Sequence, residues 1–218
     1  MADPFHVETG GPALAVGDAS LQVLKVSVSS MDNNAYLLTD PATGEQVLID
    51  AADDPSTLLT LVREHGNGTL GTIITTHQHW DHHRALAEVV AATGAQVLAG
   101  AADADALPVP VGRRITHGDT LTLGTTELSL VSLRGHTPGS IAVATSTAQT
   151  LLFTGDSLFP GGVGRTEAPA DFESLLSDVE NRLFNVYPDS AIVHPGHGDS
   201  TTLGTERPHL GQWRERGW

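Results

Sequence analysis

The chain has 218 residues, of which 39% are hydrophobic and 17% are charged, so it is long enough for one domain with a substantial core. Lys and Arg total 11 against 26 Asp and Glu, and a net charge of -15 disfavours nucleic acid as a partner because it repels phosphate. The absence of cysteine excludes disulfides, thiolate zinc sites and a cysteine nucleophile. No stretch has the length and apolarity of a membrane span or the pattern of a signal peptide, so we expect a cytoplasmic protein without a membrane partner.

The N-terminal part predicts an antiparallel meander. Residues 1–20 are rich in Gly, Pro and Asp without periodicity, and we expect a loose leader there. Alternating or β-branched runs predict strands at 21–28, 35–38 and 47–49. Residues 21–218 are then expected to form a single domain.

The middle part alternates helices and strands. Asp54 and Pro55 are typical of an N-cap and a first helical residue, and Gly66 ends that helix. A buried strand follows at 72–75, then a helix from about Asp81 to Gly94 and a strand at 96–99. This β-α-β-α-β order is typical of a layered α/β domain.

The second half repeats short strands before a helix. The strands are expected at 121–123, 127–133, 140–145, 150–153 and 191–193, with a glycine-rich loop at 155–164. One apolar face at helical spacing predicts a core helix that contains Phe172, Leu175, Leu176, Val179 and Leu183.

Four histidines and one carboxylate lie within eight residues after the 72–75 strand. Side chains alternate in an extended segment, so His77 and His79 point to the same side. Asp81 and His82 fall where the chain turns into the next helix. Imidazoles and a carboxylate suit zinc, iron or manganese, whereas a lone His-rich turn is more often solvated surface.

Three further motifs lie at strand ends, where loops collect functional groups. They are Arg134-Gly-His136-Thr-Pro-Gly-Ser140, Thr154-Gly-Asp156-Ser157 and Val193-His-Pro-Gly-His197-Gly-Asp199. Each motif alone is ordinary loop chemistry. Their order and spacing after the histidine-rich stretch make the combination specific, and they supply the missing metal ligands.

The pieces GHTPGS, GDSLFPGGVGRTE and HPGHGDSTTLGTER resemble those of metallo-β-lactamase-fold hydrolases, and the similarity runs from residue 21 to the end. Within that superfamily the chain most resembles the glyoxalase II (hydroxyacylglutathione hydrolase) group. The resemblance implies an α+β fold with layered α/β elements: a four-layer αββα sandwich with the metal site at one edge.

The resemblance also implies two divalent metal ions, with zinc preferred over iron or manganese. One metal would be held by His77, His79 and His136, the second by Asp81, His82 and His197, with Asp156 as the bridge between them. Asp50, at its strand end, matches a position that orients a ligand.

The implied activity is hydrolysis of a small-molecule thioester, in which a metal-bridging hydroxide attacks the acyl carbonyl with Asp81 and Asp156 as catalytic residues. A leaving thiol with a pKa near 8.5 needs no dedicated general acid. The alternatives are a persulfide dioxygenase with one iron on His77, His136 and Asp156, a lactonase, and a scaffold whose metal is structural. The oligomeric state is not indicated.

The sequence departs from the glutathione enzymes in several places. The helical extension that grips glutathione carboxylates is expected to be largely missing after residue 208, so lactoylglutathione is predicted to be a poor substrate. Arg165 is a candidate substrate contact or a surface arginine, and Trp80 lines the substrate entrance or packs on the sandwich edge. His83 either orients a ligand or is exposed, and His194 belongs to the core.

Overall fold

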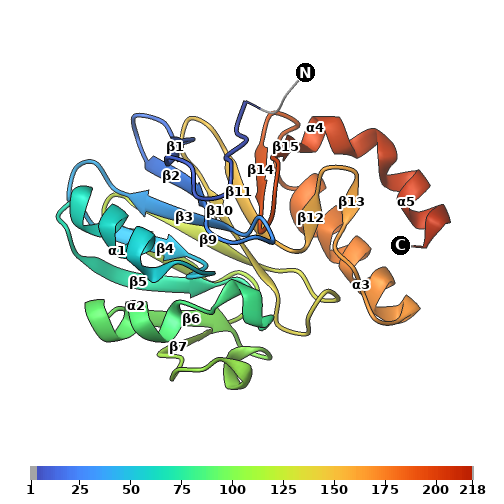
Figure 1. Cartoon of the computed structure of the whole chain (residues 1–218). Coiled ribbons are helices and arrows are strands. Elements are labelled where there is room, and N and C mark those ends of the chain that lie inside the picture. The colour runs from blue at the N-terminus through green and yellow to red at the C-terminus, as the bar shows by residue number, and fades with distance from the viewer. Residues whose placement is uncertain (1–3, 218) are drawn as a thin grey trace.

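A computed structural model describes residues 4–217, so residues 1–3 of the expected leader and residue 218 lie outside the described part. Two β-sheets face each other, and helices cover both outer faces (Figure 1). This arrangement confirms the layered αββα fold that the sequence predicts.

The first sheet has seven strands in sequence order, and β4 to β7 run parallel to one another. Its strands are β1 (Leu14–Ala15), β2 (Gln22–Ser27), β3 (Asn34–Thr39), β4 (Gln46–Ile49), β5 (Leu70–Thr75), β6 (Gln96–Gly100) and β7 (Arg113–Ile115).

The second sheet has six strands in the order β15-β14-β11-β10-β9-β8, in which β11 and β14 are parallel. Its strands are β8 (Thr120–Leu123), β9 (Thr126–Ser132), β10 (Ile141–Thr145), β11 (Leu151–Gly155), β14 (Ile192–Pro195) and β15 (Thr201–Thr202). A separate ribbon pairs β12 (Leu158–Phe159) with β13 (Gly162–Val163).

The α-helices fall into two groups, one on each outer face. The first group is α1 (Pro55–Glu64) and α2 (Leu86–Thr93); the second is α3 (Pro169–Val179), α4 (Leu203–Glu206) and α5 (Leu210–Arg216). Short 3₁₀ turns are η1 (Trp80–His82), η2 (Ala104–Ala106) and η4 (Arg207–His209), and α3 continues into the π-helical turn η3 (Glu180–Phe184).

Strand alternation produces three apolar layers. In β3, Leu37 faces the helices α1 and α2, whereas Leu38 faces the other sheet. In β9, Leu130 faces the first sheet and Val131 faces α3. Each sheet is therefore buried on both faces, which explains its near-continuous apolar strands.

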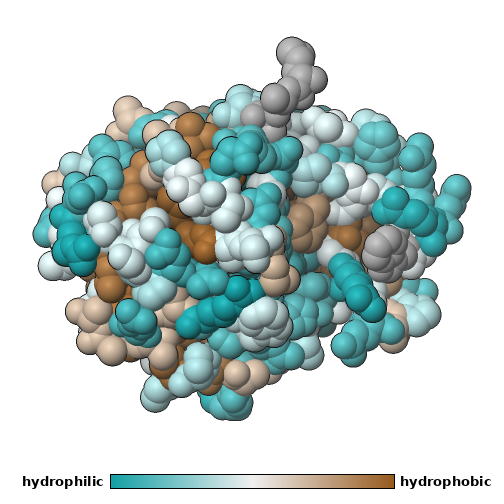
Figure 2. All heavy atoms as spheres, viewed as in Figure 1, coloured by the Kyte–Doolittle hydropathy of each residue, from teal (hydrophilic) through white to brown (hydrophobic). Residues whose placement is uncertain are grey.

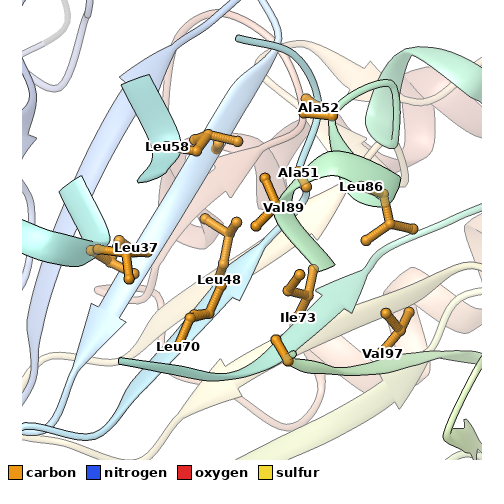
Figure 3. Close-up of a cluster of buried hydrophobic side chains, with 14 of the residues drawn as sticks. Leu37, Leu48, Ala51, Ala52, Leu58, Leu70, Ile73, Leu86, Val89 and Val97 are labelled. Atoms are coloured by element: carbon orange, nitrogen blue, oxygen red, sulfur yellow. The ribbon is translucent and has the colours of Figure 1, made fainter. Parts of the chain in front are cut away.

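Figure 3 shows the layer between the first sheet and its helices. Leu58 of α1 and Leu86 and Val89 of α2 point toward Leu48 and Ile73 of the strands below them. All five side chains have at most 1% of their surface exposed. Truncating one such leucine to alanine typically costs about 2–5 kcal/mol, so this layer fixes the first sheet against its helices.

The N-terminal segment is not the loose leader expected from its composition. Leu14 and Ala15 pair with β2, and Val7 and Val16 are buried. Phe5 and Leu14 also pack on the layer between the two sheets. The segment adds an edge strand and apolar cover, a tertiary role that its Gly- and Pro-rich composition conceals.

The helix expected from about Asp81 also differs. Residues 80–82 form η1, and the α-helix begins only at Leu86. Asp81 and His82 are buried in this turn. The delayed start keeps both side chains directed at the sheet edge instead of distributing them around a helix.

The exposed face in Figure 2 consists mostly of hydrophilic and intermediate residues, with apolar ones visible between them. In the part of the chain that the structure describes, every helix is too short or too polar to reach from one side of a bilayer to the other.

Candidate metal centre

The predicted ligands meet because of how the strands end. Parallel strands of one sheet end at the same edge, so the residues after β4, β5 and β6 are neighbours. The residues after β11 and β14 meet at the corresponding edge of the second sheet. The loop that precedes β10 joins them, since β10 is antiparallel to β11.

The first ligand group contains His77 and His79 from the loop after β5 and His136 from the loop before β10. One ligand atom of each lies within 4.8 Å of the others. Their rings meet edge to face with centroids 4.6 to 4.8 Å apart. Nδ1 of His79 is 3.1 Å from Nε2 of His77, so the two imidazoles present different nitrogens to the same point.

The second group contains Asp81 and His82 from η1 and His197 after β14. Nε2 of His197 is 3.2 Å from Oδ2 of Asp81 and 3.1 Å from Nε2 of His82. Asn33 donates a hydrogen bond to Asp81 Oδ2 at 3.0 Å, which leaves the second carboxylate oxygen of Asp81 for other partners.

Asp156 lies between the two groups. Its Oδ2 is 3.7 Å from His136 Nε2 and 3.5 Å from His197 Nε2, and its Oδ1 is 3.3 Å from His82 Nε2. Gly196 makes this approach possible, since a Cβ there would lie 2.3 Å from Asp156 Oδ1 and 2.5 Å from His82 Cε1. One carboxylate thus reaches ligands of both groups.

In three of the histidines, the ring nitrogen that faces away from the cluster donates a hydrogen bond to an oxygen of the protein. Nδ1–H of His136 donates to the carbonyl of Arg165 at 2.7 Å, and that of His197 donates to the carbonyl of Met31 at 2.8 Å. Nδ1–H of His82 donates to Asp50 at 2.9 Å. This pattern directs Nε2 of each ring inward, where a metal ion would take the place of any proton that this nitrogen carries.

Asp50, which follows β4, contacts both His82 and the residue before His77. It has a φ of 57°, in the left-handed region, directly after β4. Besides His82, its carboxylate accepts hydrogen bonds from the backbone N–H and the hydroxyl of Thr76, both at 2.8 Å. The strained backbone of Asp50 is held by these contacts, and it ties His82 to the residue before His77.

Asp103 also contacts the loops of the site, and the sequence did not predict it as a site residue. It is fully buried after β6 and accepts hydrogen bonds from Gln78 N–H at 2.9 Å, from Thr137 Oγ1 at 2.6 Å and from Gly139 N–H at 2.7 Å. It therefore joins the loop of His77 and His79 to the loop of His136. A single aspartate in an Ala-rich segment gives no sequence signal of this role.

Three weaker predictions have different outcomes. His83 donates to the carbonyl of Gln78 at 3.0 Å and so braces the backbone between His77 and His79. Trp80 is 61% exposed and stacks under the guanidinium of Arg84. Arg165 contacts the site through its backbone carbonyl, and its side chain is exposed.

The charges of the site respond to burial and to one another. Burial lowers the pKa of His77 and of His136, which keeps both rings neutral. Burial alone would lower the pKa of His82, but hydrogen bonds with Asp156 and Asp50 raise it to about 10. Burial likewise opposes ionisation of Asp156, yet hydrogen bonds with His197 and His82 hold its pKa well below the usual range.

These residues fit divalent cations. Nε2 of His136 is buried and has no hydrogen-bond partner among the described residues, which is the state of a ligand nitrogen. Imidazole nitrogens and carboxylate oxygens suit zinc, iron and manganese. A cation would displace the proton that His82 shares with Asp156, as metal binding to histidine generally does.

A family model described as the metallo-beta-lactamase superfamily matches residues 31–197. The chain belongs to the metallo-beta-lactamase superfamily. The match covers every predicted ligand, and it confirms the family that the motifs indicated.

One relative of this chain is a hydroxyacylglutathione hydrolase of Jannaschia sp. (strain CCS1), to which the chain is 37% identical over 168 residues. That alignment covers 76% of the chain but 62% of the relative, so the chain matches less than two thirds of that enzyme. Among solved structures, TTHA1623 in a di-iron-bound form is 33% identical with a TM-score of 0.68, over 84% of this chain and 96% of that one. ETHE1 from Myxococcus xanthus is 29% identical with a TM-score of 0.74, over 85% of this chain and 81% of that one.

Proposed function

We propose that the chain is a metal-dependent hydrolase of small-thiol thioesters, with two divalent cations, zinc foremost and iron or manganese as alternatives. The observation that carries the proposal is the position of Asp156 between two three-residue ligand groups. The names of the hydroxyacylglutathione hydrolase relatives support the same chemistry.

His77, His79 and His136 would hold one cation, Asp81, His82 and His197 the other, and Asp156 both. Bound there, such a pair lowers the pKa of a shared water and polarises a substrate carbonyl. With Asp156 shared, each cation would have four protein ligands, so water or substrate would enter as a fifth ligand.

The protein's own groups orient the reactants. Burial opposes ionisation of Asp81, but the hydrogen bond from Asn33 holds its pKa below the usual value, and Asp156 is also ionised. As ionised groups, both carboxylates would be acceptors for a hydrogen bond from the attacking water and would orient it. A thioester suits this site because its thiolate leaves without a general acid, the thiol pKa being about 8.5.

The test is turnover by chain loaded separately with zinc, iron or manganese, on thioesters, lactones and persulfides, with and without oxygen. Thioester hydrolysis independent of oxygen supports the proposal. Oxygen consumption with a persulfide by the iron form would assign the dioxygenase instead.

A further inference from the structure

A cavity of about 440 Å³ adjoins the metal centre on the side of the first ligand group. Its lining contains Gln78 and His79, the loop from Arg134 to Pro138, which includes His136, then Glu167, and Asp171 and Ser174 of α3. The cavity is far larger than a small acyl group. In a thioester whose carbonyl lies at the ligand cluster, the thiol half is the part large enough to fill it.

The fixed charges of this cavity are predominantly negative. Glu167 and Asp171 contribute two carboxylates and Arg134 is the one cation among the described lining residues, so the side chains give the lining one net negative charge before the charge of any bound metal ion is counted. In the described part of the chain, neither lining carboxylate has an ion-pair partner. Both are therefore available to a ligand.

Arg134 is already engaged. Its Nε and Nη2 donate to the two oxygens of Asp178 at 2.8 and 2.9 Å, the paired geometry in which arginine binds a carboxylate. Asp178 is buried, and Arg182 approaches it at 3.3 Å from the neighbouring turn of the same helix. Because Asp178 offsets the charge of this guanidinium, the N–H groups that Arg134 still exposes offer a substrate carboxylate little net attraction.

Arg165 is the other cation near the centre. Its carbonyl accepts the hydrogen bond from His136, but its side chain is exposed and does not line the cavity. Ser174 and Gln78 add a hydroxyl and an amide to the lining. The cavity thus offers hydrogen-bond acceptors, and its one cation is engaged by Asp178.

We propose, on the basis of the thioester hydrolase function, that this cavity binds the thiol half of the substrate and selects a thiol without net negative charge that carries hydrogen-bond donors. An uncharged polyol or amide thiol, or an aminothiol, has this chemistry. A thiol with free carboxylates, such as glutathione, meets Glu167 and Asp171 unfavourably.

A matched pair of thioesters tests the selection. S-acetyl-N-acetylcysteine and its carboxamide differ only by one negative charge. With zinc-loaded chain at low ionic strength, the carboxamide should have a kcat/KM about tenfold higher, mainly through KM, because like charges repel strongly at a partly enclosed site. The double variant E167Q/D171N should bring the two values within about twofold of each other.

Glu173 provides the matched control, because it lies on the same helix but lines a different cavity. E173Q should keep the wild-type preference. Equal or better hydrolysis of the anionic ester by wild type would overturn the proposal. Loss of that hydrolysis in R165A would then identify Arg165 as an anion contact.

A binding measurement separates this proposal from the hydrolase itself. The S-(2-oxopropyl) thioethers of the same two thiols resist hydrolysis, and calorimetry gives their affinities for the zinc-loaded chain. Tighter binding of the neutral thioether without turnover of any thioester supports the cavity selectivity and rejects the hydrolase. Equal binding of both thioethers, or binding of neither, overturns the selectivity.

Discussion

The carboxylate of Asp103 accepts the hydroxyl hydrogen bond of Thr137 at 2.6 Å, and its Oδ2 also accepts the N–H of Gln78 at 2.9 Å. One buried side chain therefore connects the two loops that carry His77, His79 and His136. Without touching a ligand, Asp103 fixes the distance between histidines that come from different sheets.

Replacement of this carboxylate should loosen the first ligand group. In Asp103→Asn an amide N–H₂ faces backbone or hydroxyl donors, so at least one hydrogen bond is lost. We expect metal affinity to fall about 10–100-fold, the usual cost of removing an outer partner of a metal site. Chelator competition measures this affinity.

The control for this prediction is Asp105→Asn, because Asp105 is exposed two residues away and pairs with Arg114. It should bind metal as wild type does. Unchanged metal affinity in Asp103→Asn, with the fold intact by circular dichroism, would show that the two loops hold their positions without this carboxylate.

Asp156→Ala should remove the carboxylate that reaches both ligand groups. We expect bound metal, measured by elemental analysis, to fall below that of wild type and thioester turnover to drop below detection. Asp189→Ala is the matched control, since Asp189 is an exposed partner of Arg207 and belongs to none of the ligand groups. A fully metallated, active Asp156→Ala protein would contradict the assigned bridge.

Metal removal should lower thermal stability. Seven buried or half-buried ligands converge in the folded chain only, so a metal present at 1,000 times its dissociation constant contributes about 4 kcal/mol. For a domain of this size, chelation should lower Tm by roughly 8–16 °C. Differential scanning calorimetry of wild type should show this shift, whereas Asp156→Ala should respond less; equal responses would locate the stabilising metal elsewhere.

His194 should make the fold sensitive to acid. It is fully buried between Phe5, Tyr36 and Phe153, and burial, helped by Lys25, lowers its pKa from 6.5 to about 3. Below pH 6.5 the unfolded chain binds a proton at this position that the folded chain excludes. The contribution of neutral His194 to the free energy of unfolding is complete above pH 6.5. As the pH falls from 6.5 to about 3, this contribution declines by about 1.4 kcal/mol per pH unit.

Urea unfolding between pH 7 and pH 4 measures this loss. His194→Gln keeps a partner for Ser200 but does not titrate, so its stability should decline less steeply than that of wild type. His209→Gln, at an exposed histidine, should follow wild type. Parallel curves for wild type and His194→Gln would assign the acid response to the metal-centre histidines.

Much of the fold and of the ligand set follows from the sequence because local pattern and strand order agree. The run before His77 and the apolar strand before Asp156 indicate buried strands, and buried parallel strands place their C-terminal residues at one edge. The seven predicted ligands accordingly come together as the two three-residue groups with Asp156 between them.

The parts of the fold and of the site that the sequence does not predict depend on contacts between residues far apart in the chain. Asp103 and Asn33 look like ordinary loop residues until distant loops meet around them. The two-residue strands β1, β12, β13 and β15 are too short for a periodic pattern. η1 replaces the first turn of the expected helix, since Asp81 and His82 have partners at the sheet edge.

The main-chain carbonyls of Met31 and Arg165 orient His197 and His136, while their side chains are exposed beside the centre. A different side chain at position 31 or 165 should therefore leave the carbonyl, and the histidine that it orients for a cation, in place. Evolution or a protein engineer could therefore vary these two side chains while the converging histidines and aspartates keep their arrangement.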